Sequence, residues 1–144
     1  MRIIVISDSH GNKQALDSVF LMNYDADLFL HLGDGERDVD SFLTENPDYA
    51  SRVIHVAGNC DFNSLSNDFE IIPACSHKIF LTHGPRYNVK SGLEIIKKTA
   101  ANLGCDIILY GHLAEYARLL WQVANTQFGT AINWHSSYLQ VIEK

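Results

Sequence analysis

Cysteine is scarce in this sequence, and its placement excludes two classes of small protein. The three cysteines among the 144 residues are Cys60, Cys75 and Cys105, and no two of them form a CxxC pair. An odd number of widely spaced cysteines argues against a disulfide framework and against a zinc knuckle built on thiolates.

Long hydrophobic runs and basic clusters are also missing. No apolar run approaches the roughly 20 residues that cross a bilayer, and Met1 leads directly into an apolar stretch. We therefore expect neither a membrane segment nor a signal peptide, and we expect a cytoplasmic protein. Lys and Arg number 11 against 17 Asp and Glu, which gives a formal net charge of −6. Without a basic face we do not expect nucleic-acid binding, although bound divalent cations would still allow a phosphate-bearing substrate.

The remaining composition is that of an ordinary globular protein. Hydrophobic residues make up 47% of the chain and charged residues 19%. The length suits one domain with a real core, and no linker or repeat interrupts it. We therefore expect a single domain over residues 1–144.

The first part of the chain alternates between two hydrophobic periods. Apolar runs predict strands at 2–7, 27–32 and 52–57, and helical spacing predicts helices at 12–23 and 36–46. This alternation indicates a parallel sheet covered by helices, which is an α/β fold.

The middle of the chain has a different pattern. Short strands at 69–72 and 78–82 are joined by too few residues for a helical crossover, so we expect an antiparallel hairpin. A helix is predicted over 91–103, with Ser91 as its N-cap and Glu94 completing a capping box.

The last part is less regular. A buried strand is predicted at 106–110, and three further strands at 117–121, 130–134 and 138–142, with a turn at Gly129. The apolar segment Leu119-Leu120-Trp121 would suit a homo-oligomer interface, but a core strand explains it more simply.

Polar segments that contain glycine follow five of the apolar runs, and Asp8, Asp34, Asn59, His83 and His112, one from each segment, lie 24 to 29 residues apart along the chain. That spacing is close to the roughly 30 residues of a βαβ unit. In open α/β sheets, ligands bind outside the carboxyl ends of the strands, so we expect these segments to meet there. They are Asp8-Ser9-His10-Gly11-Asn12, Gly33-Asp34, Gly58-Asn59-Cys60-Asp61, His83-Gly84 and Gly111-His112.

The side chains in these segments suit a pair of divalent metal ions. Imidazole and carboxylate donors without thiolates favour Mn, with Ni, Fe, Co or Zn as alternatives. Two metals roughly 3.5–4 Å apart need a bridging group, for which a carboxylate is the natural choice. The candidate ligands are Asp8, His10, Asp34, Asn59, His83 and His112.

Each segment alone also has an ordinary structural explanation. Asp8 or Ser9 could cap the helix at 12–23, Gly33-Asp34 could be a turn, and the segment 58–61 could be an Asx turn. The ordered set of five favours the metal interpretation.

The other histidines and Cys60 receive structural interpretations. His31 and His55 lie inside apolar strands, and His77 is interpreted as a turn residue. Cys60 is interpreted as a small packing residue, because nothing in the sequence supplies it with a base.

These segments resemble the calcineurin-like metallophosphoesterases, in particular their small bacterial and archaeal phosphodiesterases, from Met1 to about His112. The resemblance implies a four-layer α/β/β/α sandwich of two mixed sheets flanked by helices. It also implies hydrolysis of a small phosphodiester by a hydroxide that bridges two metals. In that arrangement Asp8 and His10 hold one metal, Asp34 bridges, and the second metal is held by Asn59, His83 and His112.

The sequence departs from the family pattern near its end. The family usually has Gly-His-Thr-His, whose second histidine binds the first metal, whereas Ala114 stands at that position here. Glu115 or His135 could replace the missing ligand. Cys60 stands where larger members have a proton-donating histidine, and Asp61 could assist in protonating the leaving group. The alternative to an enzyme is a catalytically impaired protein that serves as a binding or scaffold subunit.

Overall fold

The computed structural model describes residues 1–112, 130–135 and 138–143. The helices are α1 (Lys13–Met22), α2 (Glu36–Glu45) and α3 (Glu94–Asn102), with short 3-10 helices η1 (Pro47–Arg52) and η2 (Pro85–Tyr87). The strands are β1 (Arg2–Ile6), β2 (Leu28–His31), β3 (Val53–His55), β4 (Phe69–Ala74), β5 (His77–Thr82), β6 (Ile107–Tyr110), β7 (Thr130–His135) and β8 (Tyr138–Glu143).

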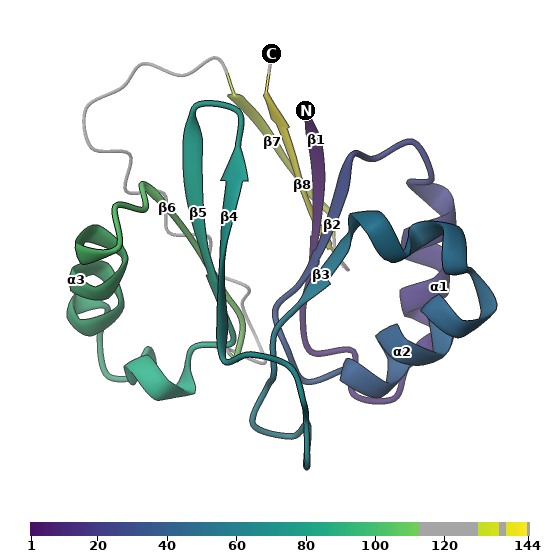
Figure 1. Cartoon of the computed structure of the whole chain (residues 1–144), viewed down its shortest axis with the longest axis horizontal. Coiled ribbons are helices and arrows are strands. Elements are labelled where there is room, and N and C mark those ends of the chain that lie inside the picture. The colour runs from purple at the N-terminus through teal and green to yellow at the C-terminus, as the bar shows by residue number, and fades with distance from the viewer. Residues whose placement is uncertain (113–129, 136–137, 144) are drawn as a thin grey trace.

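The strands form two mixed sheets that face each other. One sheet has the order β3-β2-β1-β8-β7 and the other the order β4-β5-β6. The pairs β1–β2, β2–β3 and β5–β6 are parallel, and the remaining pairs are antiparallel. Helices α1 and α2 cover the outer face of the first sheet, and α3 covers the second (Figure 1). The predicted four-layer α/β/β/α sandwich is confirmed.

Apolar side chains fill each of the three spaces between these layers. Strand β1 contributes to two of them: Ile3 and Val5 face the second sheet, and Ile4 and Ile6 face helices α1 and α2. This division explains why β1 is apolar at each position from Ile3 to Ile6, as expected for a strand buried on both faces. The third space, between α3 and the second sheet, includes the fully buried Phe80.

Helix α1 begins after Asn12, whose side-chain oxygen accepts a hydrogen bond from the Ala15 amide at 3.2 Å. The alternative in which Asp8 or Ser9 caps this helix is therefore wrong. Because Asn12 satisfies the helix terminus, the side chains of the preceding segment are available for other contacts.

The hairpin between β4 and β5 is confirmed, with longer strands than predicted. Pro73 lies inside β4, opposite Lys78, which is possible because β4 is an edge strand whose outer side needs no amide donor. His77 is the first residue of β5 rather than a turn residue, and its Nδ1 lies 2.6 Å from the Asp106 carboxylate.

The predicted start of the third helix is wrong. Helix α3 begins at Glu94, and its N-cap residue, Leu93, makes no side-chain cap hydrogen bond. Ser91 instead donates to the side chain of Asn88 at 3.1 Å. Gly92, with φ +155°, separates this turn from the helix, so the capping box does not form.

The two final strands that the structure describes, β7 and β8, confirm the strands predicted at 130–134 and 138–142. The predicted strand at 117–121 and the turn at Gly129 lie outside the described residues. Across the described ranges, no helix has the length and apolarity that a membrane crossing requires.

The aromatic cluster beneath α1 and α2 generates a stability prediction. Phe20 is fully buried and stacks on Phe42 with ring centroids 4.4 Å apart. Phe20→Ala should lower the free energy of unfolding by about 3–5 kcal/mol in urea denaturation. Met22→Ala, at a 71% exposed position of the same helix, should change it by about 0.5 kcal/mol or less. Equal effects of the two substitutions would contradict this account of the core.

Candidate metal centre

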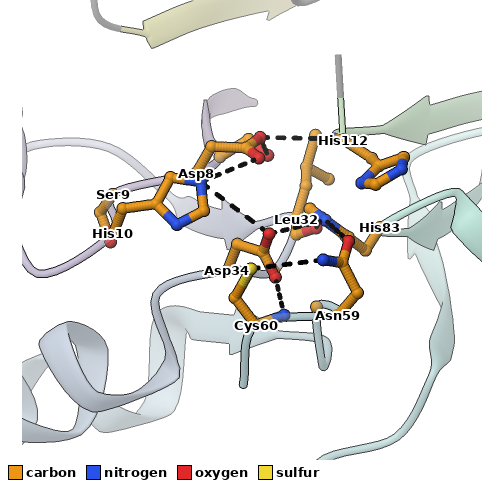
Figure 2. A network of polar contacts seen from close by, with 12 residues as sticks. Asp8, Ser9, His10, Leu32, Asp34, Asn59, Cys60, His83 and His112 are labelled. Carbon is orange, nitrogen blue, oxygen red and sulfur yellow. Dashed lines mark hydrogen bonds and ion pairs between the residues drawn. The ribbon is translucent and has the colours of Figure 1, made fainter. Parts of the chain in front are cut away.

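The five polar segments come together at one end of the sandwich. They follow β1, β2, β3, β5 and β6, and these strands end at the lower edge of the molecule in Figure 1. The structure brings all the predicted ligands into one network of polar contacts, shown in Figure 2. Its members are Asp8, His10, Asp34, Asn59, His83 and His112.

Asp34 lies at the middle of this network. Its side chain is almost fully buried, at 3% exposure, and it belongs to two groups of possible metal-binding side chains. One group is Asp34 with His83 and His112, and the other is Asp34 with His10 and Cys60; in each, the candidate donor atoms lie within 4.8 Å of one another. A carboxylate shared between two such groups is placed as a bridging ligand would be.

His83 is held in one tautomer. Its Nδ1 lies 2.7 Å from the backbone oxygen of Leu32, and since a carbonyl can only accept, Nδ1 carries a proton. In the neutral imidazole, Nε2 then presents a lone pair, 3.2 Å from the Asn59 Oδ1 and 3.2 Å from the Asp34 Oδ2. A cation between these atoms would make this arrangement favourable. A backbone partner on the other ring nitrogen is typical of metal-binding histidines.

The opposite side of Asp34 is more open. His10 is about half exposed, and its Nε2 lies 3.9 Å from Asp34 Oδ2 and 3.7 Å from Asp8 Oδ1. The other oxygen of Asp8 accepts hydrogen bonds from the Ser7 hydroxyl and, at 3.4 Å, from the His112 amide. Asp8 therefore ties the first segment to the last one and leaves Oδ1 facing His10.

Four of the candidate ligands have left-handed backbone conformations. The φ angles are +56° for Asp8, +46° for His10, +59° for Asp34 and +69° for His112. Such conformations are uncommon outside glycine and cost on the order of 1–3 kcal/mol each, and they cluster at functional sites. The strain is thus concentrated in the residues that face the centre.

Asp61 joins the second and third segments. Its carboxylate accepts backbone hydrogen bonds from Asp34 and Gly58, both at 2.8 Å, and from Glu36 at 3.0 Å. Burial opposes ionisation of this carboxyl, but the three amide donors outweigh it and lower its pKa. Asp61 is therefore ionised at neutral pH and positions backbone, which does not suit it for protonating a leaving group.

Asp38 plays a similar part for the first segment, and sequence reasoning missed it. It is buried on α2, and its Oδ2 accepts from the Ser9 hydroxyl at 2.6 Å and the Gly11 amide at 2.9 Å. The available signal was the position of Asp38 in the first turn of an amphipathic helix. Acidic residues are common there because they stabilise the helix dipole, so the position alone did not indicate a contact with the first segment.

Cys60 is not the packing residue that the sequence suggested, because it is exposed. A hydrogen bond to Asp34 is the main cause that raises the pKa of the Cys60 thiol, and partial loss of solvation is a smaller cause. The thiol is then protonated at neutral pH in the metal-free protein, which agrees with the interpretation that it is not a nucleophile.

His112 and His31 both have lowered pKa values, with different consequences. Burial, the positive charge of Lys90 and His83 lower the pKa of His112, so its imidazole is neutral and free to bind a cation. His31 is a core histidine, as expected, and burial lowers its pKa to about 4. His55 is half-buried and its Nδ1 lies 3.3 Å from the Ser66 hydroxyl, in agreement with a strand-face position.

Comparisons with known proteins indicate a phosphoesterase family. The sequence model of the calcineurin-like phosphoesterase superfamily domain matches residues 1–118. The probable metallophosphoesterase YsnB of Bacillus subtilis is 34% identical over 113 residues, which is 78% of this chain and 63% of the relative. The chain thus spans a little under two thirds of that relative's length.

Two solved structures show the fold. A conserved protein of Streptococcus pneumoniae, described as a predicted phosphoesterase, has 31% identity and a TM-score of 0.66 over 78% of this chain and 62% of its own. Vps29 of Entamoeba histolytica has 24% identity and a TM-score of 0.61 over 96% of this chain and 71% of its own, which shows a shared fold.

The donor set fits the divalent metal ions that this family implies. Imidazole nitrogens and carboxylate and amide oxygens surround Asp34 on two sides, and the fixed tautomer of His83 presents a lone pair to them. Ala114 and Glu115 lie outside the described residues, and the structure describes only the backbone at His135.

Close approach of Gly58 to Asp34 generates a prediction about metal affinity. A Cβ on Gly58 would lie 2.1 Å from both the Asp34 amide nitrogen and its Oδ1. Gly58→Ala should therefore displace the carboxylate and weaken Mn²⁺ binding about 10–100-fold in calorimetric titration. Gly104→Ala, where a Cβ meets nothing within 4 Å, is the control; its φ of +70° makes the substitution cost stability, but the folded variant should bind metal as the wild type does. Wild-type affinity in both variants would contradict the central place of Asp34.

Burial of His31 generates a prediction about pH. With a folded pKa of about 4 against 6.5 unfolded, the unfolded chain binds one more proton between these values. The free energy of unfolding should therefore fall by about 3 kcal/mol through this group as pH drops from about 6.5 to 4. In His31→Gln that contribution disappears, so the difference between the two denaturation profiles should change over this window. A constant difference from pH 7 to 4 would show that His31 does not titrate in this way.

Proposed function

The chain belongs to the calcineurin-like phosphoesterase superfamily, and on that premise we propose that it hydrolyses a small phosphodiester at a centre of two divalent metal ions. The observation that carries the proposal is the position of Asp34, whose carboxylate is common to two groups of candidate ligands. A single metal would need one such group, and a dinuclear centre needs both.

The proposed ligands divide into two sets that share Asp34. Asp8 and His10 lie on the open side of Asp34, and Asn59 and His112 lie on the other side with the buried His83. Support comes from the contacts already described: Nε2 of His83 faces Asn59 and Asp34, and Oδ1 of Asp8 faces His10. Manganese is the proposed metal for a set dominated by nitrogen and oxygen donors, with Ni, Fe, Co or Zn as alternatives.

Bound metals of this kind polarise phosphoryl oxygens, lower the pKa of water and stabilise the charge that develops during hydrolysis. The chain's own groups supply the framework. Leu32 fixes the His83 ring through its backbone oxygen, and the Cys60 amide donates to Asp34 Oδ1 at 2.7 Å. Rigid placement of this kind is what positions a substrate for attack.

Access and charge also suit an anionic substrate. His10 is about half exposed, so the open side of the centre meets solvent. Lys90 is exposed, and its positive charge contributes to the lowered pKa of His112. A cation therefore lies near the centre in a protein of negative net charge. A phosphodiester carries one negative charge that such a cation would attract.

A binding or scaffold subunit with an impaired centre is the second candidate. The observation that favours it is in the sequence, where Ala114 replaces a histidine that the family pattern leads us to expect. The Asp8 and His10 side would then hold its metal more weakly. Turnover in the presence of added metal separates the two candidates.

Turnover of bis-p-nitrophenyl phosphate with Mn²⁺ tests the proposal. Asp34→Asn keeps the shape of the side chain and removes its charge, so activity should fall by about 100-fold or more, since each 1.4 kcal/mol of lost stabilisation is about tenfold. The matched control is Asp40→Asn, the same change at an exposed position of α2, which should leave activity unchanged. A chelator should abolish wild-type turnover, and Mn²⁺ should restore it.

Two outcomes would contradict the enzyme. One is a folded wild-type protein without turnover in Mn²⁺, Ni²⁺, Co²⁺ or Zn²⁺, which would favour the scaffold. The other is equal activity in wild type and Asp34→Asn, which would show that turnover does not arise at this centre.

A further inference from the structure

Cys60 has a position that neither packing nor nucleophilic chemistry explains. Its side chain is exposed at the edge of the centre, yet its Sγ lies within 4.8 Å of candidate donor atoms of His10 and Asp34. Figure 2 shows the sulfur beside the Asp34 carboxylate, in contact with the Asn59 side chain. An exposed thiol on a surface loop has no packing reason to be directed inward in this way.

The loop holds Cys60 firmly against Asp34. The Cys60 amide donates to Asp34 Oδ1 at 2.7 Å, and the Asn59 Nδ2 donates to Sγ at 3.3 Å. The neighbouring Asp61 carboxylate binds the amides of Asp34 and Gly58. The distance between the thiol and the open side of the centre is therefore set by the same hydrogen bonds that place Asp34.

The open side is also the side that needs a further donor. Among the residues that the structure describes, Asp8, His10 and Asp34 are the nitrogen and oxygen ligands proposed there, whereas tetrahedral sites in proteins use four donors. Cys60 is the described side chain that groups with two of these three.

We propose that the Cys60 thiolate is an additional ligand of the metal held by Asp8, His10 and Asp34. This inference rests on the two-metal function proposed above. On binding, the sulfur–metal bond forms and the thiol proton leaves to solvent, so binding of a divalent ion raises the net charge of the site by one unit instead of two. Cys60 then compensates for the histidine ligand of the family pattern that Ala114 replaces.

A thiolate on one side makes the two metal positions chemically different. Soft sulfur donors favour Zn²⁺, Co²⁺ and Fe²⁺ over Mn²⁺, whereas imidazole and oxygen donors discriminate less. The open position should therefore prefer a softer metal than the position formed by Asn59, His83 and His112.

Cobalt absorption spectroscopy on the whole chain tests the proposal, because thiolate ligation gives a charge-transfer band that imidazole and oxygen ligands do not. Titration of the metal-free wild type with Co²⁺ should produce this band together with the ligand-field bands. Cys60→Ser should lose the charge-transfer band, keep ligand-field bands, and bind Zn²⁺ at least about tenfold more weakly at one position. Cys75→Ser, at another exposed thiol, is the matched control and should keep the band.

The outcomes separate this inference from the function on which it rests. Cobalt bound to wild type without a charge-transfer band, or a band that persists in Cys60→Ser, overturns the role of Cys60 and leaves the phosphoesterase proposal standing. A wild-type chain that binds no cobalt overturns both. Because Cys60 is exposed, circular dichroism should show that Cys60→Ser is folded. Cys60→Ala should give the same cobalt absorption spectrum as Cys60→Ser.

Discussion

The geometry of this end of the molecule depends on where one carboxylate is held. Asp34 is buried, and both its backbone amide and its side chain are bound by the loop that follows β3. Gly58 approaches so closely that a single methyl group would collide with Asp34. The two parallel strands β2 and β3 bring these loops together, and Asp61 joins them. Strand order therefore fixes the position of the carboxylate that we propose as the bridging ligand.

The electrostatics of the centre follow from that position. Nε2 of His83 lies 3.2 Å from Asn59 Oδ1 and 3.2 Å from Asp34 Oδ2, an arrangement that a bound cation would stabilise. Left-handed backbone at four candidate ligands adds a cost on the order of 1–3 kcal/mol each. The three apolar spaces of the sandwich offset this cost, because the strands that carry the loops are buried on both faces. A well-packed core thus permits strained backbone at the edge where the candidate ligands lie.

Periodic patterns predicted an α/β fold with helices over a parallel sheet, and the family resemblance supplied the four-layer arrangement. The apolar run Ile3–Ile6 of β1 predicted a strand buried on both faces, and the spacing of Leu16, Val19 and Phe20 predicted the helix beside it; all of these residues are buried. Hydrogen bonds between segments could not be predicted, because the spacing of hydrophobic residues does not indicate which backbone amide a carboxylate will bind. Asp38 was therefore missed, and Asp61 and Cys60 received other interpretations. The predicted capping box at Ser91 was wrong because Gly92, at φ +155°, separates Ser91 from the start of helix α3.

The claim that Asp34 bridges two metals is tested most directly by anomalous diffraction from crystals of the whole chain equilibrated with Mn²⁺. The account predicts two anomalous peaks roughly 3.5–4 Å apart, with one Asp34 oxygen directed at each or one shared by both. One peak should lie toward His10 and the other toward His83. A single peak at full occupancy, or two peaks that do not share Asp34, would contradict it.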